Sequence, residues 1–487
     1  MLERERFVRK AEIHGAEPTA AVRERSQTAG VGDELFERLG PHEPGDLAGA
    51  GPGDLLSAPF DPCRIEIDRS GEVECDGHGP SVRIVRASKL GDVSDLPYAA
   101  FDADNHYYEA LDAFTRYVDP KMQARCVQWC EVNGRKYHVV GGTVSHAVVN
   151  PTFDPVAKAG AMHDYFRGNP NKLQPYEFLR EREPIPAEYR NRDARVAKLD
   201  EFGLEGVWLF PTLGILYEEL IKHDIEAVTT LFSAFNRWLA DDWGFEYEGR
   251  IFASPYISLA DLDWAVHELE WAIDNGARHV VMRPAAPHTA SGQIAVSDPR
   301  NDPFWARVNE AGITVVVHAG DSGYSSNGYA VDGFAAGFSG NGRWAPNVKT
   351  FHIERAAYDF LITLVFDKLF ERFPNVRIAS VENGAEFLGD LFNKLRSTDH
   401  KMPGYFTDDP IEAFKRNVWI NPFWEDDVNT VVDLMGADRV IFGSDWPHIE
   451  GMPRPLDYAV EVKQFDDASI QQIMRDNARE LTARRPA

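Results

Sequence analysis

Apolar and polar positions follow two alternating patterns along most of this chain. Short, nearly continuous apolar runs are separated by stretches with the three- and four-residue spacing of amphipathic helices, for example 260–275 and 356–373. Strands that are apolar along their whole length are typical of a parallel sheet covered by helices, and eight strand–helix units close into a barrel. The eight runs lie at 98–104, 206–212, 250–256, 278–284, 313–320, 376–384, 417–422 and 439–448.

This pattern predicts an α/β protein with a (β/α)8 fold, the TIM barrel. An open, doubly wound parallel sheet is the alternative. Open sheets usually carry a phosphate-binding loop of the GxGxxG or GxxxxGKS/T type, and the sequence contains neither in the required context. The barrel is therefore the preferred interpretation.

Two regions lie outside the barrel pattern. Residues 1–96 are rich in Gly, Pro and acidic residues, with one alternating segment around Ser70 and Gly71, and they predict an N-terminal arm with a β-hairpin. A second hairpin is predicted where Asn133-Gly134 supplies a tight turn, inside an insertion at about 120–200. We expect the barrel to occupy 97–487.

Charge and composition narrow the classes of partner. The chain has 51 Lys and Arg against 77 Asp and Glu, a formal charge of -26, which disfavours nucleic acid or an anionic membrane as a partner. Four cysteines without regular spacing do not predict a disulfide framework. The start of the chain lacks an apolar signal-peptide segment, and no apolar window is long enough to span a bilayer. A cytoplasmic location is expected.

Candidate chemistry gathers where the predicted strands end, which is where barrel enzymes carry their active sites. The candidate metal ligands there are Asp104, His106, His318, Glu382 and Asp445. A lone histidine at a strand end is more often structural than a ligand. However, several buried carboxylates at one end of a barrel would each cost several kcal/mol without cations. Imidazole with carboxylate suits zinc, manganese or iron, and a carboxylate-rich set favours the last two.

Other residues have two open interpretations. His352, Glu354 and His448 lie on predicted loops and are further candidate ligands. Glu109 either reaches the site or caps the helix that follows it. Asp102 is a candidate for a residue that orients the ligands. Arg283 is either an anchor for an anionic group or part of a structural ion pair.

From about 97 to 485 the sequence resembles the amidohydrolase superfamily, in particular its decarboxylase-like branch. The segments that carry the resemblance are 101–106, 315–320, 370–384 and 436–448. Position by position, the resemblance implies that the first-strand HxH motif falls on Asp104 and His106. It places the fifth-strand histidine on His318 and the eighth-strand aspartate on Asp445.

This sequence departs from the family pattern at two places. Asp104 replaces the first histidine, and Glu382-Asn383-Gly384 replaces the sixth-strand His-Gly-Gly, so the family's usual acid/base histidine is absent. A set rich in both His and carboxylate is similar to that of the TIM-barrel nonheme diiron monooxygenases, whose known example serves antibiotic biosynthesis. That resemblance implies two Fe ions bound by Asp104, His106, His318, His352, Glu382, Asp445 and His448.

Within this resemblance, Glu382 and His448 are the expected catalytic residues. The implied reaction is O2-dependent hydroxylation of an apolar acyl group, of diterpenoid type and carried on CoA, with a separate electron donor. A homodimer is allowed. The alternative is a mononuclear hydrolase or decarboxylase with one Zn or Mn, in which Glu382 or His448 is the base. A barrel without catalytic activity, used as a binding module, is the third class.

Overall fold

The structure is a computed structural model, and it describes residues 96–148, 150–324, 352–423 and 426–485. The predicted N-terminal arm and its hairpin at Ser70-Gly71 lie outside the described residues. Among the described residues, no helix is both long enough and apolar enough to cross a membrane.

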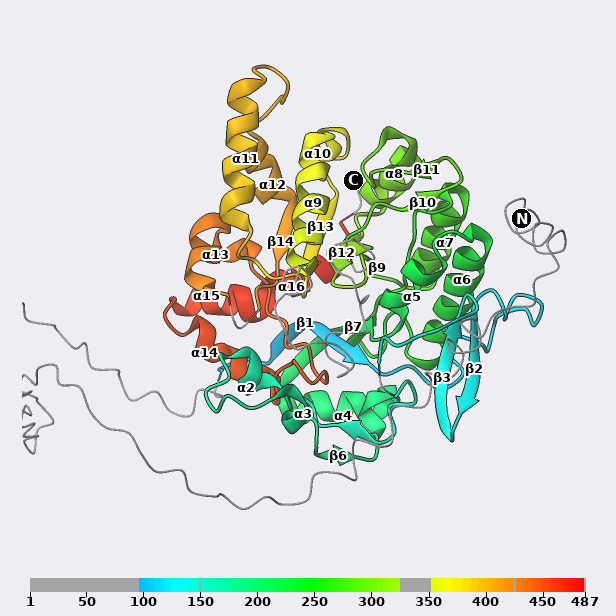
Figure 1. Cartoon of the computed structure of the whole chain (residues 1–487). Helices are drawn as coiled ribbons and strands as arrows, with labels where there is room; N and C mark the ends of the chain where they lie inside the picture. The colour runs from blue at the N-terminus through cyan, green and yellow to red at the C-terminus, as the bar shows by residue number, and fades with distance from the viewer. Residues whose placement is uncertain (1–95, 149, 325–351, 424–425, 486–487) are drawn as a thin grey trace, which may run out of the picture. The chain divides into compact units, whose positions relative to one another are not determined.

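Seven parallel strands form the centre of this region, as the apolar runs predict (Figure 1). They form two sheets, ordered β1-β7-β8 and β14-β13-β12-β9. All seven are buried on both faces, which explains their continuous apolar sequences. Their bounds are β1 Ala100–Tyr107, β7 Leu204–Pro211, β8 Ile251–Ala253, β9 His279–Met282, β12 Thr314–His318, β13 Arg377–Val381 and β14 Val418–Ile420.

Isolated parallel bridges, and not continuous ladders, join the two sheets. Tyr256, just after β8, pairs with Val281 of β9. At the other edge, the segment 440–446 pairs with β14 through Ile420↔Val440 and with β1 through Asn105↔Trp446. These links place eight strand segments in chain order around one ring, which is the connectivity of an eight-stranded barrel interrupted at its bridges. An open sheet would leave two free edges, so the doubly wound alternative is disfavoured.

The eighth predicted strand, 439–448, does not form a regular ladder. Its backbone still bonds to both neighbours, with Ile441 N donating to Ile420 O at 2.9 Å and Ala103 N donating to Phe442 O at 2.9 Å. Asp445 then takes a φ of 55°. Because a left-handed residue cannot continue an extended strand, the regular strand is interrupted at Asp445, and the segment meets β1 again only through the single bridge at Trp446.

Helices separate the strands and lie outside them (Figure 1). Asp261 caps α7 by accepting from Trp264 N, which explains why the predicted helix at 260–275 begins there. The helix predicted at 356–373 is two helices, α9 and α10, because Lys368 between them has a φ of 57°. The bounds are α4 Arg192–Phe202, α5 Gly214–Ile221, α6 Ile225–Asp242, α7 Leu262–Asp274, α8 Asp302–Ala311, α9 His352–Phe366, α10 Leu369–Arg372, α11 Leu388–Lys401, α12 Pro410–Asn417, α13 Val428–Met435, α14 Ala459–Val462, α15 Asp467–Gln471 and α16 Asn477–Thr482.

The predicted insertion contains the predicted hairpin. β2 pairs antiparallel with β3, and Asn133 and Gly134 between them have φ values of 53° and 75°. His138 anchors the hairpin through Nδ1, which is 2.7 Å from the hydroxyl of Tyr217 on α5. The small elements here and nearby are β2 Val127–Val132, β3 Arg135–Val140, β4 Thr143–Val144, β5 Val156–Ala157, α2 His163–Phe166, α3 Pro175–Phe178, β6 Arg182–Glu183, β10 His288–Thr289 and β11 Gly292–Gln293.

Candidate metal centre

β1 supplies the first two predicted ligands. Asp104 and His106 are two positions apart, so their side chains leave the strand on the same side. Oδ1 of Asp104 is 3.3 Å from Nε2 of His106, and both residues are only 1% exposed. One strand therefore presents a carboxylate and an imidazole to the same point.

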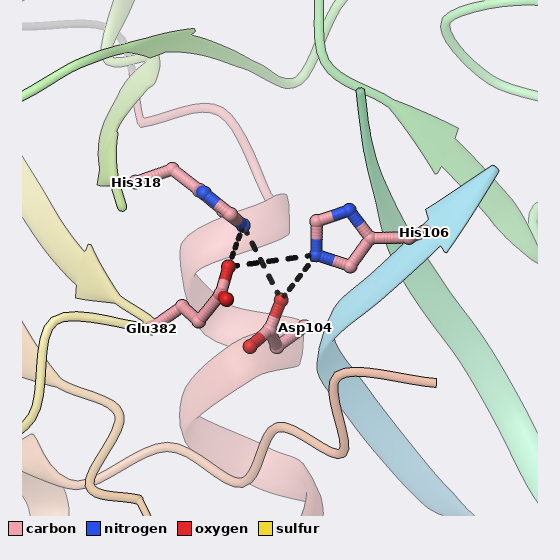
Figure 2. Close-up of side chains that lie close together, drawn as sticks. All are labelled: Asp104, His106, His318 and Glu382. Atoms are coloured by element: carbon pink, nitrogen blue, oxygen red, sulfur yellow. Dashed lines mark ion pairs between the residues drawn. The ribbon is translucent and has the colours of Figure 1, made fainter. Parts of the chain in front are cut away.

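The neighbouring strands β12 and β13 bring two more ligands to that point. His318 is the last residue of β12, and Glu382 directly follows β13. Nε2 of His318 is 3.3 Å from Oε2 of Glu382 and 3.5 Å from Oδ1 of Asp104. Figure 2 shows that the side chains of Asp104, His106, His318 and Glu382 point toward one another from three separate strands. We call these four residues the first set.

A second set of ligand atoms adjoins the first. It consists of Glu382, Asp445, His448 and Glu450, whose ligand atoms lie within 4.8 Å of one another. Oδ1 of Asp445 is 2.6 Å from Nδ1 of His448 and 3.3 Å from Nε2 of His106. Glu382 belongs to both sets, so its carboxylate lies between them.

The residues present fit a transition-metal ion. Buried ligand atoms of Asp104, His106, His318 and Asp445 have no hydrogen-bond partner within the described part of the chain. Such atoms are costly unless something else satisfies them. Two donors about 2.1 Å from one ion are about 3.0–3.5 Å apart. Most of the separations above fall in or near that range, so a cation could replace the missing hydrogen bonds without a large movement.

Burial and crowded charge govern ionisation in this centre. Burial raises the pKa of Glu382 well above its usual range, and the charges of Asp445 and Asp104 raise it further. Burial also raises the pKa of Asp445, with Glu450 as the next cause. For Asp104, burial opposes ionisation, but the neighbouring imidazoles of His106 and His318 outweigh it and lower its pKa to about 2. The carboxylates repel one another, and a cation would relieve this repulsion.

Two of the carboxylates stand on unusual backbone. Glu382 and Asp445 have φ values of 57° and 55°, in the left-handed region that non-glycine residues rarely adopt. Residues held there often lie at functional sites, because the surrounding structure must compensate for their strain. Next to them, a Cβ placed on Gly443 would lie 2.4 Å from Cβ of Asp104. Only glycine at 443 lets the eighth segment approach β1 this closely.

Two buried polar side chains hold the backbone that carries the ligands. Asp102 accepts hydrogen bonds from Ser444 Oγ at 2.6 Å and Ser444 N at 3.0 Å, which ties β1 to the residue before Asp445. Arg195 donates to the carbonyl of His106 at 2.7 Å and to Asn105 Oδ1. Asp102 thus has the orienting position expected from the sequence.

The structure resolves the two interpretations of Glu109 and Arg283. Glu109 caps a helix, but the expected helix was wrong: it caps α5, which follows β7, by accepting from the backbone amides at the start of that helix at 2.7 and 3.0 Å. Arg283 Nη1 pairs with Glu219 Oε2 at 2.7 Å, and its Nε lies 3.4 Å from Glu218 Oε2. Arg283 is therefore part of a structural ion pair, and the anion-anchor alternative is not supported.

Two predicted residues stay outside both sets. His352 begins α9 and is buried, but it is not among the ligand groups formed by the described residues, so its role as a ligand remains a prediction. Glu354 lies beside Gly384, and burial followed by the charge of Glu386 raises its pKa. Neither residue is needed to complete the first set.

Sequence reasoning missed Glu450 and Thr212. Glu450 follows His448 by two positions, a spacing that could have drawn attention to it. Thr212 directly follows β7, at the strand end where barrel sites are formed, yet a single threonine carries no metal-ligand signal. Its contact with His448, at 2.9 Å, is visible only in the folded chain.

Comparison with known proteins identifies the family. A family model described as amidohydrolase matches residues 213–482. The crystal structure of an amidohydrolase from Mycobacterium avium subsp. paratuberculosis is similar to this chain at 39% identity, covering 80% of this chain and 100% of that one, with a TM-score of 0.75. A 5-carboxyvanillate decarboxylase from Novosphingobium aromaticivorans, crystallised with manganese, has 15% identity over 79% of this chain and 96% of that one, with a TM-score of 0.50. No curated protein matches. The family match covers more than half of the sequence, and the chain therefore belongs to the amidohydrolase family.

Proposed function

We propose that this protein is a metal-dependent hydrolase of the amidohydrolase superfamily, with one divalent cation held by the first set. The observation that carries the proposal is the convergence of buried ligand atoms without hydrogen-bond partners, within the described residues, from β1, β12 and the segment after 440. The 39% identical amidohydrolase, matched over its full length, supports the reaction class. Manganese or zinc suits this mixture of carboxylate and imidazole.

The charge of the centre favours hydrolysis over decarboxylation. A decarboxylase must bring the carboxylate of its substrate to the metal, and here that group would meet the carboxylates of Asp104, Glu382, Asp445 and Glu450. An amide or ester, whose reacting carbonyl is neutral, fits this negatively charged centre better than a substrate carboxylate does.

The chain's own residues supply proton transfer and orientation. When bound, the cation would polarise the substrate carbonyl and lower the pKa of a water molecule. His448 is the proposed base, because Nδ1 is at hydrogen-bonding distance from Asp445 and its side chain is 12% exposed, compared with 1% for His106. Asp445 stabilises the imidazolium that forms when Nδ1 takes a proton. His106 stacks on this ring, with centroids 3.8 Å apart, and holds its plane.

One observation favours a second candidate function, an O2-dependent diiron monooxygenase. Glu382 lies in both ligand sets, so two ions could share its carboxylate. The four carboxylates of the two sets would balance the charge of two divalent ions, whereas a single ion leaves two negative charges uncompensated. In this candidate an apolar acyl group, carried on CoA, would be hydroxylated with electrons from a separate donor.

Metal analysis with oxygen dependence distinguishes these functions. Freshly purified protein and protein reconstituted with Mn2+, Zn2+ or Fe2+ would be measured for metal content and for turnover of amide and ester substrates, with and without O2. About one Mn or Zn per chain and equal anaerobic hydrolysis support the hydrolase. Two Fe per chain with O2 consumption and no hydrolysis would replace it with the monooxygenase. A protein that binds no metal after reconstitution contradicts both.

A further inference from the structure

Thr212 connects the end of β7 to the proposed base. Its hydroxyl oxygen lies 2.8 Å from the carbonyl oxygen of Tyr107 and 2.9 Å from Nε2 of His448. Tyr107 is the last residue of β1, and it is paired in register with Pro211, the residue before Thr212. The hydroxyl therefore stands between two neighbouring strand ends and the imidazole.

The hydroxyl has one proton, and its two partners determine where that proton goes. A carbonyl oxygen can only accept, so the contact with Tyr107 requires the threonine hydroxyl to donate to it. The hydroxyl oxygen must then accept from Nε2 of His448. If the hydroxyl donated to Nε2 instead, two oxygen lone pairs would face each other at 2.8 Å. The favourable arrangement has hydrogen on Nε2.

We propose that Thr212 is a positioning residue that keeps the hydrogen of His448 on Nε2 and leaves Nδ1 as the nitrogen that faces the centre. Nδ1 lies 2.6 Å from Oδ1 of Asp445, and at this separation a hydrogen shared with the Asp445 carboxyl lies between the two atoms in the metal-free protein. With Nε2 committed to Thr212, only Nδ1 can take up a proton or meet a cation. This inference rests on the proposed function for its purpose, since the orientation serves His448 as base or as ligand.

The surroundings hold Thr212 in this place. Directly after it, the carboxylate of Glu109 accepts the backbone amides of Leu213 and Gly214, at 2.7 and 3.0 Å. A residue just after β1 thus holds the backbone just after β7, and with it the Thr212 hydroxyl that accepts from His448. On the other side, the stacking of His448 on His106 fixes the plane of the imidazole. The Thr212 hydroxyl and the His448 imidazole are therefore each held in place by contacts that do not depend on the hydrogen bond between them.

The test compares Thr212→Val, which removes the hydroxyl at nearly constant volume, with Thr212→Ser, which restores it. Thr314→Val is the matched control, because Thr314 is a buried threonine whose hydroxyl also donates to a backbone carbonyl, that of Leu481 at 2.7 Å. The imidazole nitrogens are labelled with 15N, and the signals of His448 are assigned by their loss in His448→Gln. Spectra are recorded for metal-free and Zn2+-loaded protein, and Zn2+ affinity is measured by competition with a chelator.

We expect hydrogen on Nε2 of His448 in the wild type and in Thr212→Ser, with or without Zn2+. In Thr212→Val we expect hydrogen on Nδ1 in part of the metal-free molecules. If His448 serves as a ligand, the Zn2+ affinity should also be about 10- to 100-fold lower, as is typical of losing a residue that orients a ligand; if it serves as the base, the affinity should stay unchanged. Thr314→Val should change neither. A wild type with hydrogen on Nδ1 alone overturns the inference, even if Thr212→Val does not fold, and so does a Thr212→Val protein with wild-type spectrum and affinity.

Failure of the proposed function gives a different result. A protein that keeps the Nε2 hydrogen in a Thr212-dependent way, yet hydrolyses no substrate, supports the positioning role and contradicts the hydrolase. Active hydrolysis with an unchanged His448 spectrum in Thr212→Val contradicts only the positioning role.

Discussion

Oδ1 of Asp104 lies 3.3 Å from Nε2 of His106, although the two residues belong to one strand and are separated by a single residue. Alternate residues of a β-strand lie on the same face, so Asp104 and His106 can contact the same ion. His318 approaches this pair from β12, and its Nε2 lies 3.5 Å from the same oxygen of Asp104. The core of the centre thus consists of two residues on β1 and His318 at the end of β12.

Replacing His318 by Asn should sharply reduce metal binding. The change removes a buried imidazole that faces both Asp104 and Glu382, so the remaining ligands cannot complete the first set. We expect a loss of affinity of more than 100-fold, which exceeds the usual effect of removing a supporting residue. Metal content per chain and chelator competition measure it. His138→Gln is the control, because His138 is buried in the hairpin and outside both sets. Full metal content in His318→Asn would rule out the first set.

Gly443→Ala should damage the centre without touching a ligand. The added methyl group would lie 2.4 Å from Cβ of Asp104, so β1 and the eighth segment must move apart. Overpacking of this kind costs roughly 1–3 kcal/mol, and the shift of Asp104 should lower metal affinity as well. Urea unfolding and metal titration measure the two effects. Gly389→Ala is the matched control, since nothing lies within 4 Å of a Cβ at that position. Equal behaviour of the two variants would contradict the close approach.

Removing the metal should lower the thermal stability of the protein. The carboxylates of Glu382 and Asp445 lie close together in the centre, and without a cation their repulsion opposes the folded state. A ligand present at 100 times its Kd stabilises the folded state by about 2.7 kcal/mol, so a chelator should lower the Tm by several degrees. Differential scanning calorimetry with and without chelator measures the change, and added Mn2+ should reverse it. In Asp104→Asn the chelator should shift the Tm less than in the wild type, because Asp104 belongs to the first set; an equal shift would place the metal elsewhere.

Glu109→Gln should make the protein more stable at alkaline pH. Burial is the main cause that raises the pKa of Glu109 from 4.5 to about 7. Because the folded pKa exceeds the unfolded one, the folded state binds more protons between these values. The stability contribution is full below pH 4.5 and is lost as the pH rises through about 7. Glutamine keeps an oxygen for the α5 amides but cannot ionise.

We therefore expect similar urea stability of Glu109→Gln and wild type near pH 4.5, apart from a constant offset. The difference should grow to about 3 kcal/mol in favour of the variant by pH 8, from a pKa change of about 2.5 units at 1.36 kcal/mol each. Unfolding curves at several pH values would measure this. A difference that stays constant with pH would show that the buried carboxyl does not titrate in this range.

The strand pattern of the sequence was sufficient to predict much of the fold. Seven of the eight apolar runs are parallel strands, because a strand buried on both faces needs apolar side chains at nearly every position. The prediction of a regular eighth strand at 439–448 was wrong. Its departure depends on the left-handed φ of Asp445 and the tight packing of Gly443 on β1, and neither leaves a periodic signal in the sequence.

For the site, the sequence by itself determined which residues end the strands, and so predicted Asp104, His106, His318, Glu382 and Asp445 as neighbours. This follows because the carboxyl ends of parallel strands share one end of a barrel. Only the tertiary structure decided that Glu450 joins His448, that His352 stays outside both sets, and that Thr212 meets His448 across 236 residues of sequence. Such contacts depend on loop paths and side-chain directions, which arise from packing between segments distant in the chain and not from any local pattern.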